Sequence, residues 1–361
     1  MSTTIHELTT PAVLVDRDRM EQNIRAMQAH CDAHGVELRP HVKTHKMIEA
    51  ARRQRAAGAR GLVAAKLGEA EALLPAGPGE FFIAHALVDQ EQGARVAALS
   101  ERLGELRVAA TSAEQAEALE RVARRAGRRL GVMMAVDTGL GREGVRALVA
   151  AQALAAQIGR SAHLELKGFY SHEGQLYGVP RAEQEVRTRE VLDKLCGVRD
   201  AIDVALPVWP GCSVNARIAV ASGRVQAVRP GAYLFGDLYL SQVCGVMAFE
   251  DVAVSVWATV IDKPEAGLAL IDAGSKVFSS DRTPEGVFGA TAERDGLNVV
   301  RVNEEHGYVG GAGVDALRVG ERLRFVPAHV CTVINLTDTV TVVEGERVVD
   351  TWTVDARGCV R

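Results

Sequence analysis

Short apolar runs alternate with helical segments over most of the chain. The runs are rich in β-branched and aromatic residues and span residues 38–44, 61–67, 80–86, 106–112, 129–137, 164–173, 207–213 and 226–233. Segments rich in Ala, Arg, Glu and Leu lie between them, including residues 46–59, 68–77, 112–127 and 144–159. Several runs are continuously apolar, as expected for parallel strands covered by helices on both faces. Eight β–α repeats predict a (β/α)8 barrel, with a doubly wound open sheet as the alternative.

The pattern changes after Tyr239. Residues 251–274 contain two β runs and a turn, and further β runs follow in residues 322–336 and 339–354 with almost no helical spacing. The early run "PAVLVD", residues 11–16, precedes the first helix and is expected to add a strand to this second region. A chain of 361 residues exceeds the usual size of one core. We therefore predict a barrel over residues 22–240 and an all-β domain built from residues 1–21 and 241–361.

Composition narrows the class of protein. The chain is 47% apolar and 24% charged with a net charge of -4, so neither nucleic acid nor an anionic membrane is expected as a partner. The first ten residues contain no apolar signal core, and no apolar run is long enough to span a bilayer. Six cysteines without tight spacing fit a reducing compartment. These features predict a cytoplasmic protein.

Reactive side chains end the predicted barrel strands, where the chemistry of such barrels is placed. They are Lys43, His45, Lys66, His85, Asp137, Tyr170, His172 and Tyr233. Lys43 closes an apolar run and is flanked by His41, His45 and Lys46. Because neighbouring cations lower the pKa of a lysine, Lys43 is a candidate for Schiff-base chemistry. The alternative is an ordinary surface lysine.

Two glycine-containing loops follow strands. In "PGCSVN", Gly211 permits close approach of the backbone, and Ser213 and Asn215 precede a helix whose free N–H groups could bind phosphate. An ordinary helix cap is the alternative. In "VDTGLGREG", residues 136–144, the glycine spacing fits neither a Walker loop nor a dinucleotide fingerprint. Arg142 lies in this second loop and could reach into the barrel mouth.

His329 and Cys331 lie two residues apart on a predicted strand and would share one face. An imidazole and a thiolate are good zinc ligands. Two ligands make only half of a site, so water, substrate or another residue would have to complete it. A buried pair without a metal is the alternative.

Together these motifs resemble the pyridoxal-phosphate enzymes of the alanine-racemase-like fold, in the branch that holds D-threonine aldolase and D-serine dehydratase. The resemblance covers nearly the whole chain through "TPAVLVD", "RPHVKTHK", "AKLGEAE", "VDTGLGREGV", "GFYSHEGQLY", "RPGAYLFGD", "IDAGSK", "NEEHG", "PAHVCTVINL" and "DARG". The "RPHVKTHK" block and the late His-x-Cys are its most specific parts.

The resemblance implies a role for each candidate residue. Lys43 would bind pyridoxal phosphate covalently, with His172 beside the cofactor, and both would be catalytic. Arg142 would contact the phenolate side of the cofactor. Gly211, Cys212, Ser213 and Asn215 would lie near the phosphate, and Tyr233 would reach the phosphate or the edge of the cofactor. His329 and Cys331 would bind a divalent metal (zinc, manganese or magnesium), and the family is usually homodimeric.

The implied activity is that of a lyase on D-configured 3-hydroxy amino acids. The favoured reaction is cleavage of D-threonine to glycine and an aldehyde. The stretches that favour an aldolase are "AKLGEAE", "VDTGLGREG" and "DARG". Cys331 departs from the aldolase pattern, which has Asp there, and a thiolate favours zinc. Cys331 therefore favours the alternative reaction, in which a dehydratase converts D-serine or D-threo-3-hydroxyaspartate to a keto acid and ammonia. His172 and His306 are candidate acid–base helpers.

Two other classes stay open. An amino-acid racemase would share the barrel and the lysine but has no need of a metal near Cβ. A small pyridoxal-phosphate carrier would resemble the barrel alone, without the β domain.

Overall fold

The computed structural model describes residues 3–291, 294 and 296–361. The chain divides into two compact units. The barrel unit contains Ala26–Lys43, Ile48–Gly231 and Cys359–Arg361, and the β unit contains the rest of the described chain. Among the described residues, no helix combines the length and the apolar composition needed to cross a bilayer.

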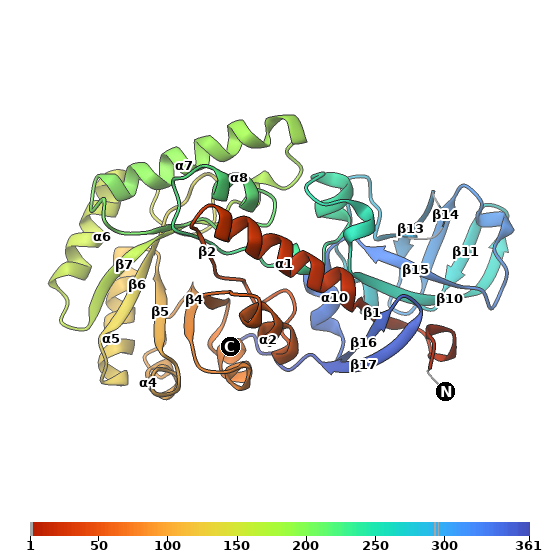
Figure 1. Cartoon of the computed structure of the whole chain (residues 1–361), viewed down its shortest axis with the longest axis horizontal. Coiled ribbons are helices and arrows are strands. Elements are labelled where there is room, and N and C mark those ends of the chain that lie inside the picture. The colour runs from red at the N-terminus through yellow and green to blue at the C-terminus, as the bar shows by residue number, and fades with distance from the viewer. Residues whose placement is uncertain (1–2, 292–293, 295) are drawn as a thin grey trace. The chain divides into compact units, whose positions relative to one another are not determined.

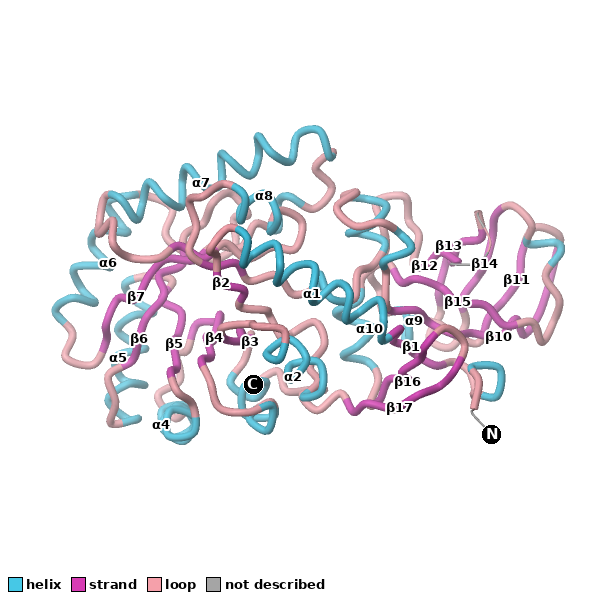
Figure 2. Tube along the Cα trace, in the orientation of Figure 1, coloured by secondary structure: helices cyan, strands magenta, loops and turns pink. Residues whose placement is uncertain are grey.

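Eight parallel strands line the barrel unit, and all eight predicted runs contribute one (Figures 1 and 2). Six of them form one sheet in chain order: β3 (Gly61–Ala64), β4 (Glu80–Ala86), β5 (Glu105–Ala110), β6 (Leu130–Ala135), β7 (Leu164–Tyr170) and β8 (Val208–Trp209). Strands β2 (Glu37–Leu38) and β9 (Ala227–Val228) pair with each other. Backbone hydrogen bonds join this pair to the sheet on both sides, including Val63 N–H to Pro40 O (2.9 Å) beside β3 and Arg229 N–H to Pro210 O (3.1 Å) beside β8. The predicted (β/α)8 barrel is therefore confirmed.

Three strands are only two residues long because prolines interrupt their runs. Pro40 follows β2, Pro210 follows β8, and Pro230 follows β9. Proline has no N–H to donate to a ladder, so the regular pattern is interrupted there. Beyond Pro40 the pairing resumes through the His41 N–H, which donates to Pro230 O at 3.0 Å, and the Val42 N–H, which donates to Val63 O at 2.8 Å.

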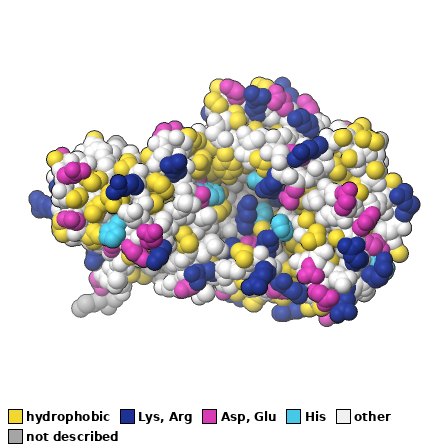
Figure 3. Space-filling view, turned by 180° about the vertical axis from the view of Figure 1, so that it is seen from behind, with side chains coloured by type: hydrophobic (Ala, Val, Ile, Leu, Met, Phe, Trp, Pro, Cys, Tyr) yellow, Lys and Arg dark blue, Asp and Glu magenta, His cyan; other side chains and the backbone are white. Residues whose placement is uncertain are grey.

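Helices cover the outside of the strands. They are α1 (Arg17–Ala33), α2 (Ile48–Ala56), α3 (Leu67–Ala72), α4 (Gln92–Arg102), α5 (Ala113–Ala126), α6 (Leu148–Arg160), α7 (Gln184–Asp200) and α8 (Ala216–Ala221). Helix α5 begins where the Ser112 hydroxyl accepts the Gln115 N–H (3.1 Å) and ends at Gly127, whose φ of 64° suits glycine. Its Arg-rich outer face is solvated, and Figure 3 shows basic and acidic side chains interspersed over the face that it draws.

The N-terminal end of the barrel holds a ring of charges around a cavity of about 590 Å³. We call it the basal charge ring; it consists of Glu37, Arg39, Arg60, Glu80, Glu105 and Arg107. Arg39 lies 2.8 Å from Glu37 and 2.7 Å from Glu80, and its side chain is only 6% exposed. The guanidinium groups of Arg39 and Arg107 lie 4.4 and 4.7 Å from the Trp209 ring centre. Trp209 thus separates this ring from the apolar barrel interior, which contains Val63, Phe82, Ala109 and Met133.

The β unit contains a closed antiparallel barrel. Its strands are β10 (Val254–Glu265), β11 (Leu268–Ile271), β12 (Gly289–Thr291), β13 (Leu297–Val302), β14 (Gly307–Gly311) and β15 (Arg322–Pro327). They pair in the order β11-β14-β13-β12-β15-β10, and β10 pairs back to β11. Strand β1 (Ala12–Asp16) joins β10 and β16 (Thr339–Glu344), which forms a hairpin with β17 (Arg347–Thr353). The expectation that "PAVLVD" adds a strand to this region is confirmed.

The predicted strand through His329 and Cys331 is wrong. Strand β15 stops at Pro327, and His329 is the extended residue before helix α10 (Val330–Leu336). The β-branched run favoured a strand, but the residues buried in α10 are Val330, Val333 and Ile334. This spacing of three and four is that of one helix face, so burial of that face overrides the local preference. A second short helix, α9 (Ser275–Phe278), follows β11.

Candidate active site

Lys43 lies at the carboxyl end of a barrel strand, as predicted. The Val42 N–H donates to the Val63 carbonyl of β3 at 2.8 Å, and Lys43 is the next residue. Its N–H donates to His41 Nδ1 at 3.4 Å. Lys46, one of the expected cationic neighbours, belongs to the β unit, and its ammonium donates to Asn335 Oδ1 at 2.8 Å.

The loop after β6 presents Arg142. Asp137 shapes this loop, because one carboxylate oxygen accepts the N–H groups of Gly139 and Gly141 at 3.0 Å each. The other accepts from Arg146 at 2.9 Å. Burial raises the pKa of Asp137, but these hydrogen bonds outweigh it and lower the pKa. Asp137, expected among the reactive strand ends, is therefore engaged in fixing the loop.

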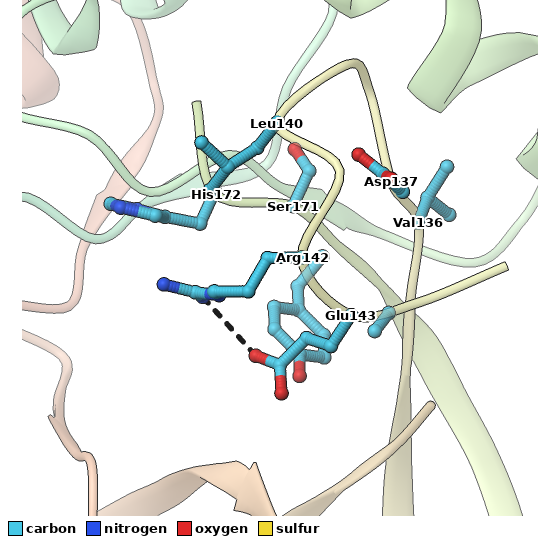
Figure 4. A pocket seen from close by; sticks show the side chains of 9 residues that line it. Val136, Asp137, Leu140, Arg142, Glu143, Ser171 and His172 are labelled. Atoms are coloured by element: carbon cyan, nitrogen blue, oxygen red, sulfur yellow. Dashed lines mark hydrogen bonds and ion pairs between the residues drawn. The ribbon is translucent and has the colours of Figure 1, made fainter. Parts of the chain in front are cut away.

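Arg142 and His172 extend to the same side of the site, with Arg142 paired to Glu143 at 3.1 Å (Figure 4). His172 Nδ1 donates to the Gly211 carbonyl at 2.7 Å, which leaves Nε2 as the acceptor. Burial, followed by the positive charge of Lys43, lowers the pKa of His172 to about 3. The imidazole is therefore neutral at physiological pH.

A buried charged pair supports this site, and sequence reasoning missed it. The Glu173 carboxylate accepts the Ser171 hydroxyl and the Gly211 N–H (3.0 Å). The Arg229 guanidinium donates to the carbonyls of Ser171 and Trp209. Burial raises the pKa of Glu173 and lowers that of Arg229. Both residues stand inside quoted motifs and inside the predicted runs 226–233 and 164–173, where no local pattern indicates a role for them.

Gly211 is required by this pair. A side chain on Gly211 would place its Cβ 2.3 Å from Arg229 Nη2. Arg229 is held by two carbonyls and stacks on the Tyr170 ring with 5.0 Å between guanidinium and ring centre, so it has little room to move. The close backbone approach expected at Gly211 is therefore present, although it is toward Arg229.

The loop between β8 and α8 fits a bound anion. Asn215 is 1% exposed, and neither polar atom of its side chain has a hydrogen-bond partner among the described residues. A buried amide without partners is costly, and the oxygens of a bound anion would accept from its Nδ2. Ser213 Oγ accepts the Gly231 N–H at 3.2 Å, and Cys212 is buried beside it in the chain. Together with Lys43 and His172, this loop fits pyridoxal phosphate.

Two predicted residues belong to the β unit and not to the barrel unit. Tyr233 is buried in the short turn Ala232–Leu234. His306 is exposed between β13 and β14, where its carbonyl accepts the Asn303 N–H at 2.8 Å.

His329 and Cys331 come together in the β unit although they do not share a strand. Asp237 orients the histidine, because its Oδ2 accepts from His329 Nδ1 at 2.9 Å and from the Val330 N–H at 3.1 Å. The second oxygen accepts the Leu240 N–H at 2.9 Å. A carboxylate on one imidazole nitrogen is the usual support of a metal-binding histidine, whose other nitrogen binds the metal. Asp237 was missed as a site residue, although it ends the quoted "RPGAYLFGD".

The imidazole and the thiol interact directly. Burial alone would lower the pKa of His329, but Cys331 and Asp237 outweigh it and raise the pKa to about 11. The Cys331 sulfur also lies 3.2 Å from the Thr44 hydroxyl. Within residues 3–291, 294 and 296–361, no three His, Cys, Asp or Glu side chains form a set that could hold a metal. An imidazole supported by a carboxylate, beside a thiol, has the chemistry of two ligands of a divalent metal, whose remaining ligands would have to come from elsewhere.

Comparison with family models and solved structures identifies the fold family of the chain. A family model for the N-terminal domain of alanine racemase matches residues 15–239, and one for a putative serine dehydratase domain matches residues 253–343. The solved D-threonine aldolase from Filomicrobium marinum superposes with a TM-score of 0.90 at 28% identity, covering 100% of this chain and 98% of that one. The protein is thus an alanine-racemase-like barrel with a second β unit.

Comparison with characterised relatives identifies the branch of this fold family to which the chain belongs. A D-threonine aldolase from an Arthrobacter species is 33% identical, covering 97% of this chain and 93% of the relative. The D-threo-3-hydroxyaspartate dehydratase of a Delftia species is 35% identical, covering 92% and 93%. A solved cysteine-to-alanine variant of that dehydratase is described as metal-free; its TM-score is 0.87 at 30% identity, covering 97% and 98%. The chain belongs to the family that holds these two enzymes, and the predicted resemblance is confirmed.

Proposed function

We propose that this chain is a lyase that uses pyridoxal phosphate and a divalent metal to act on D-configured 3-hydroxy amino acids. Its main reaction is the cleavage of D-threonine to glycine and acetaldehyde. The observation that carries the proposal is the pairing of His329 with Cys331, oriented by Asp237. A racemase on the same barrel has no need of such a pair, and a cofactor carrier has no need of the second unit. The names of the relatives support the same class.

The chain offers a ligand to each part of the cofactor. Lys43 Nζ is the amine that holds it covalently, and Asn215 and Ser213 offer polar groups to its phosphate. Arg142 would contact the phenolate side of the cofactor. When bound, pyridoxal phosphate supplies an electron sink for the bond that breaks at Cα, and a zinc, manganese or magnesium ion lowers the pKa of a hydroxyl beside it.

The protein's own groups then handle protons. His172 is neutral and fixed through Nδ1, so its Nε2 accepts a hydrogen bond and does not carry a proton at neutral pH. Because Asp237 Oδ2 accepts from His329 Nδ1, Nε2 is the nitrogen that would bind a metal. His172 and His306 remain predictions for the base that takes the proton of the substrate's β-hydroxyl.

One observation favours a second candidate function. The ligand beside His329 is a thiol, whereas the aldolase pattern has a carboxylate. A dehydratase reaction would have Lys43 Nζ take the proton from Cα while the β-hydroxyl leaves, and the products are a keto acid and ammonia. The 35% identity to a dehydratase supports this alternative equally.

D-Threonine separates the two reactions because it is a substrate for either. The purified protein is loaded with pyridoxal phosphate and with zinc or manganese, and the products are identified. Glycine with acetaldehyde establishes the aldolase, and 2-oxobutanoate with ammonia establishes the dehydratase. A Lys43→Ala variant should lose the cofactor's visible absorbance and all turnover. Absence of both product pairs from the loaded wild type, or full activity of the variant, would overturn the proposal. The homodimer implied by the resemblance remains a prediction.

A further inference from the structure

Lys66 and His85 form a pair at the barrel mouth that the proposed reaction leaves unused. The Lys66 ammonium lies 2.9 Å from His85 Nε2. Lys66 is partly buried and His85 is exposed. No carboxylate of the described residues lies within ion-pair distance of Lys66, whereas Arg142 has Glu143. An ammonium has three N–H groups, so after donating to His85 it has two left for a ligand.

The strand register places this pair beside Lys43. His41 forms a parallel bridge with Val63 of β3, and Ala64 of β3 pairs with Ile83 of β4. Lys43 lies two residues beyond His41, and Lys66 and His85 lie two residues beyond Ala64 and Ile83. The three side chains therefore stand at the carboxyl ends of adjacent strands, where barrel enzymes bind their substrates.

The charges around the pair favour an anion. Burial lowers the pKa of His85, and the charges of Lys66 and Arg142 add to this effect, against an opposing contribution from Glu143. A neutral imidazole accepts one hydrogen from Lys66 and leaves the ammonium charge uncompensated. A carboxylate is the group that an ammonium with two free N–H donors would bind.

We propose that Lys66, positioned by His85, binds a carboxylate of the amino-acid substrate. This inference rests on the proposed lyase function. The carboxylate has two sources: the α-carboxylate that every amino acid carries, or the second carboxylate of a substrate such as 3-hydroxyaspartate.

The test measures KM and kcat of the cofactor- and metal-loaded enzyme with D-threonine and with D-threo-3-hydroxyaspartate. Replacement Lys66→Met should raise KM about tenfold to a hundredfold, the effect of one lost charge-assisted hydrogen bond, with a smaller change in kcat. A rise with both substrates assigns the α-carboxylate, and a rise with 3-hydroxyaspartate alone assigns the second carboxylate. Lys66→Arg should recover most of the loss because it keeps the charge.

The control is Lys167→Met, which removes the same charge from β7 of the same unit, where Lys167 pairs with Glu165 at 2.7 Å. It should leave KM unchanged. A second readout is inhibition by succinate, whose inhibition constant should rise by a similar factor in Lys66→Met and not in the control. An unchanged KM for both substrates, or a fall confined to kcat, would overturn the proposal while the wild type still turns over. A wild type that cleaves or dehydrates neither substrate would instead refute the proposed function.

Discussion

Replacing Asp237 with Asn should weaken metal binding without removing the metal ligands themselves. The Asp237 side chain is fully buried and accepts three hydrogen bonds, from His329 Nδ1, Val330 N–H and Leu240 N–H at 2.9, 3.1 and 2.9 Å. An asparagine has only one acceptor oxygen. If that oxygen faces His329 and Val330, the amide nitrogen faces the Leu240 N–H. In the reverse orientation the amide nitrogen faces the donors of His329 and Val330.

Either orientation carries two losses. One buried donor lacks an acceptor, which costs roughly 1–3 kcal/mol of folding stability. The imidazole also loses its charged partner, and loss of such support typically lowers metal affinity about tenfold to a hundredfold, or roughly 1.4–2.8 kcal/mol. We therefore expect Asp237→Asn to remain folded and to bind zinc with an affinity lower by that factor.

Competition between the protein and a chromophoric zinc chelator measures this affinity directly and without turnover. Asp272→Asn is the matched control, because Asp272 is also a carboxylate of the β unit that accepts a backbone N–H, from Thr259 at 2.8 Å, and it touches no histidine. Cys331→Ser gives the reference for a lost ligand. Equal zinc affinities of wild type and Asp237→Asn would refute the reasoning that Asp237 orients the metal-binding histidine.

Two further predictions concern the barrel unit. Gly211→Ala should destabilise the cofactor-free protein by about 2 kcal/mol in urea unfolding, because the new Cβ would lie 2.3 Å from a buried Arg229 that cannot withdraw. The control is Gly159→Ala, at a helical position with nothing within 4 Å, which should be neutral or stabilising. Equal stability of the two variants would contradict the crowding argument. His172 should stay neutral in the folded protein from pH 8 to pH 5, because its pKa is lowered from 6.5 to about 3. The unfolded chain then takes up the proton first, so the stability that the neutral form contributes above pH 6.5 is lost progressively between pH 6.5 and 3. Long-range ¹H–¹⁵N spectra, assigned by comparison with His172→Gln, should show one Nδ1–H tautomer over that range, and protonation near pH 6.5 would be incompatible with the buried geometry.

The barrel could be predicted because its signal is repeated. Eight apolar runs with helical segments between them leave few architectures, and the structure has Lys43 and His172 at the ends of barrel strands, where the strand-end rule predicts them. The lengths of strands β2, β8 and β9 were not accessible in this way, although Pro40, Pro210 and Pro230 contained the information.

The features that the sequence analysis predicted wrongly or missed depend on contacts between segments distant in the chain. His329 and Cys331 were placed on a strand because β-branched residues surround them, whereas tertiary burial of Val330, Val333 and Ile334 selects a helix. Asp237 lies 92 residues before His329, and no local pattern links the two. Arg229 sits within an apolar run, and only the fold brings its guanidinium onto the carbonyl of Ser171.

The basal charge ring has a consequence for how members of this family diverge. Arg39 is almost fully buried between Glu37 and Glu80, so a substitution of Glu80 alone leaves a buried cation with one partner fewer, at a cost of several kcal/mol. Exchange of both members for apolar residues carries no such penalty. Homologous proteins in which this end of the barrel is apolar should therefore have lost both charges together. Positions 39 and 80 should covary across homologous sequences even though neither takes part in the proposed chemistry.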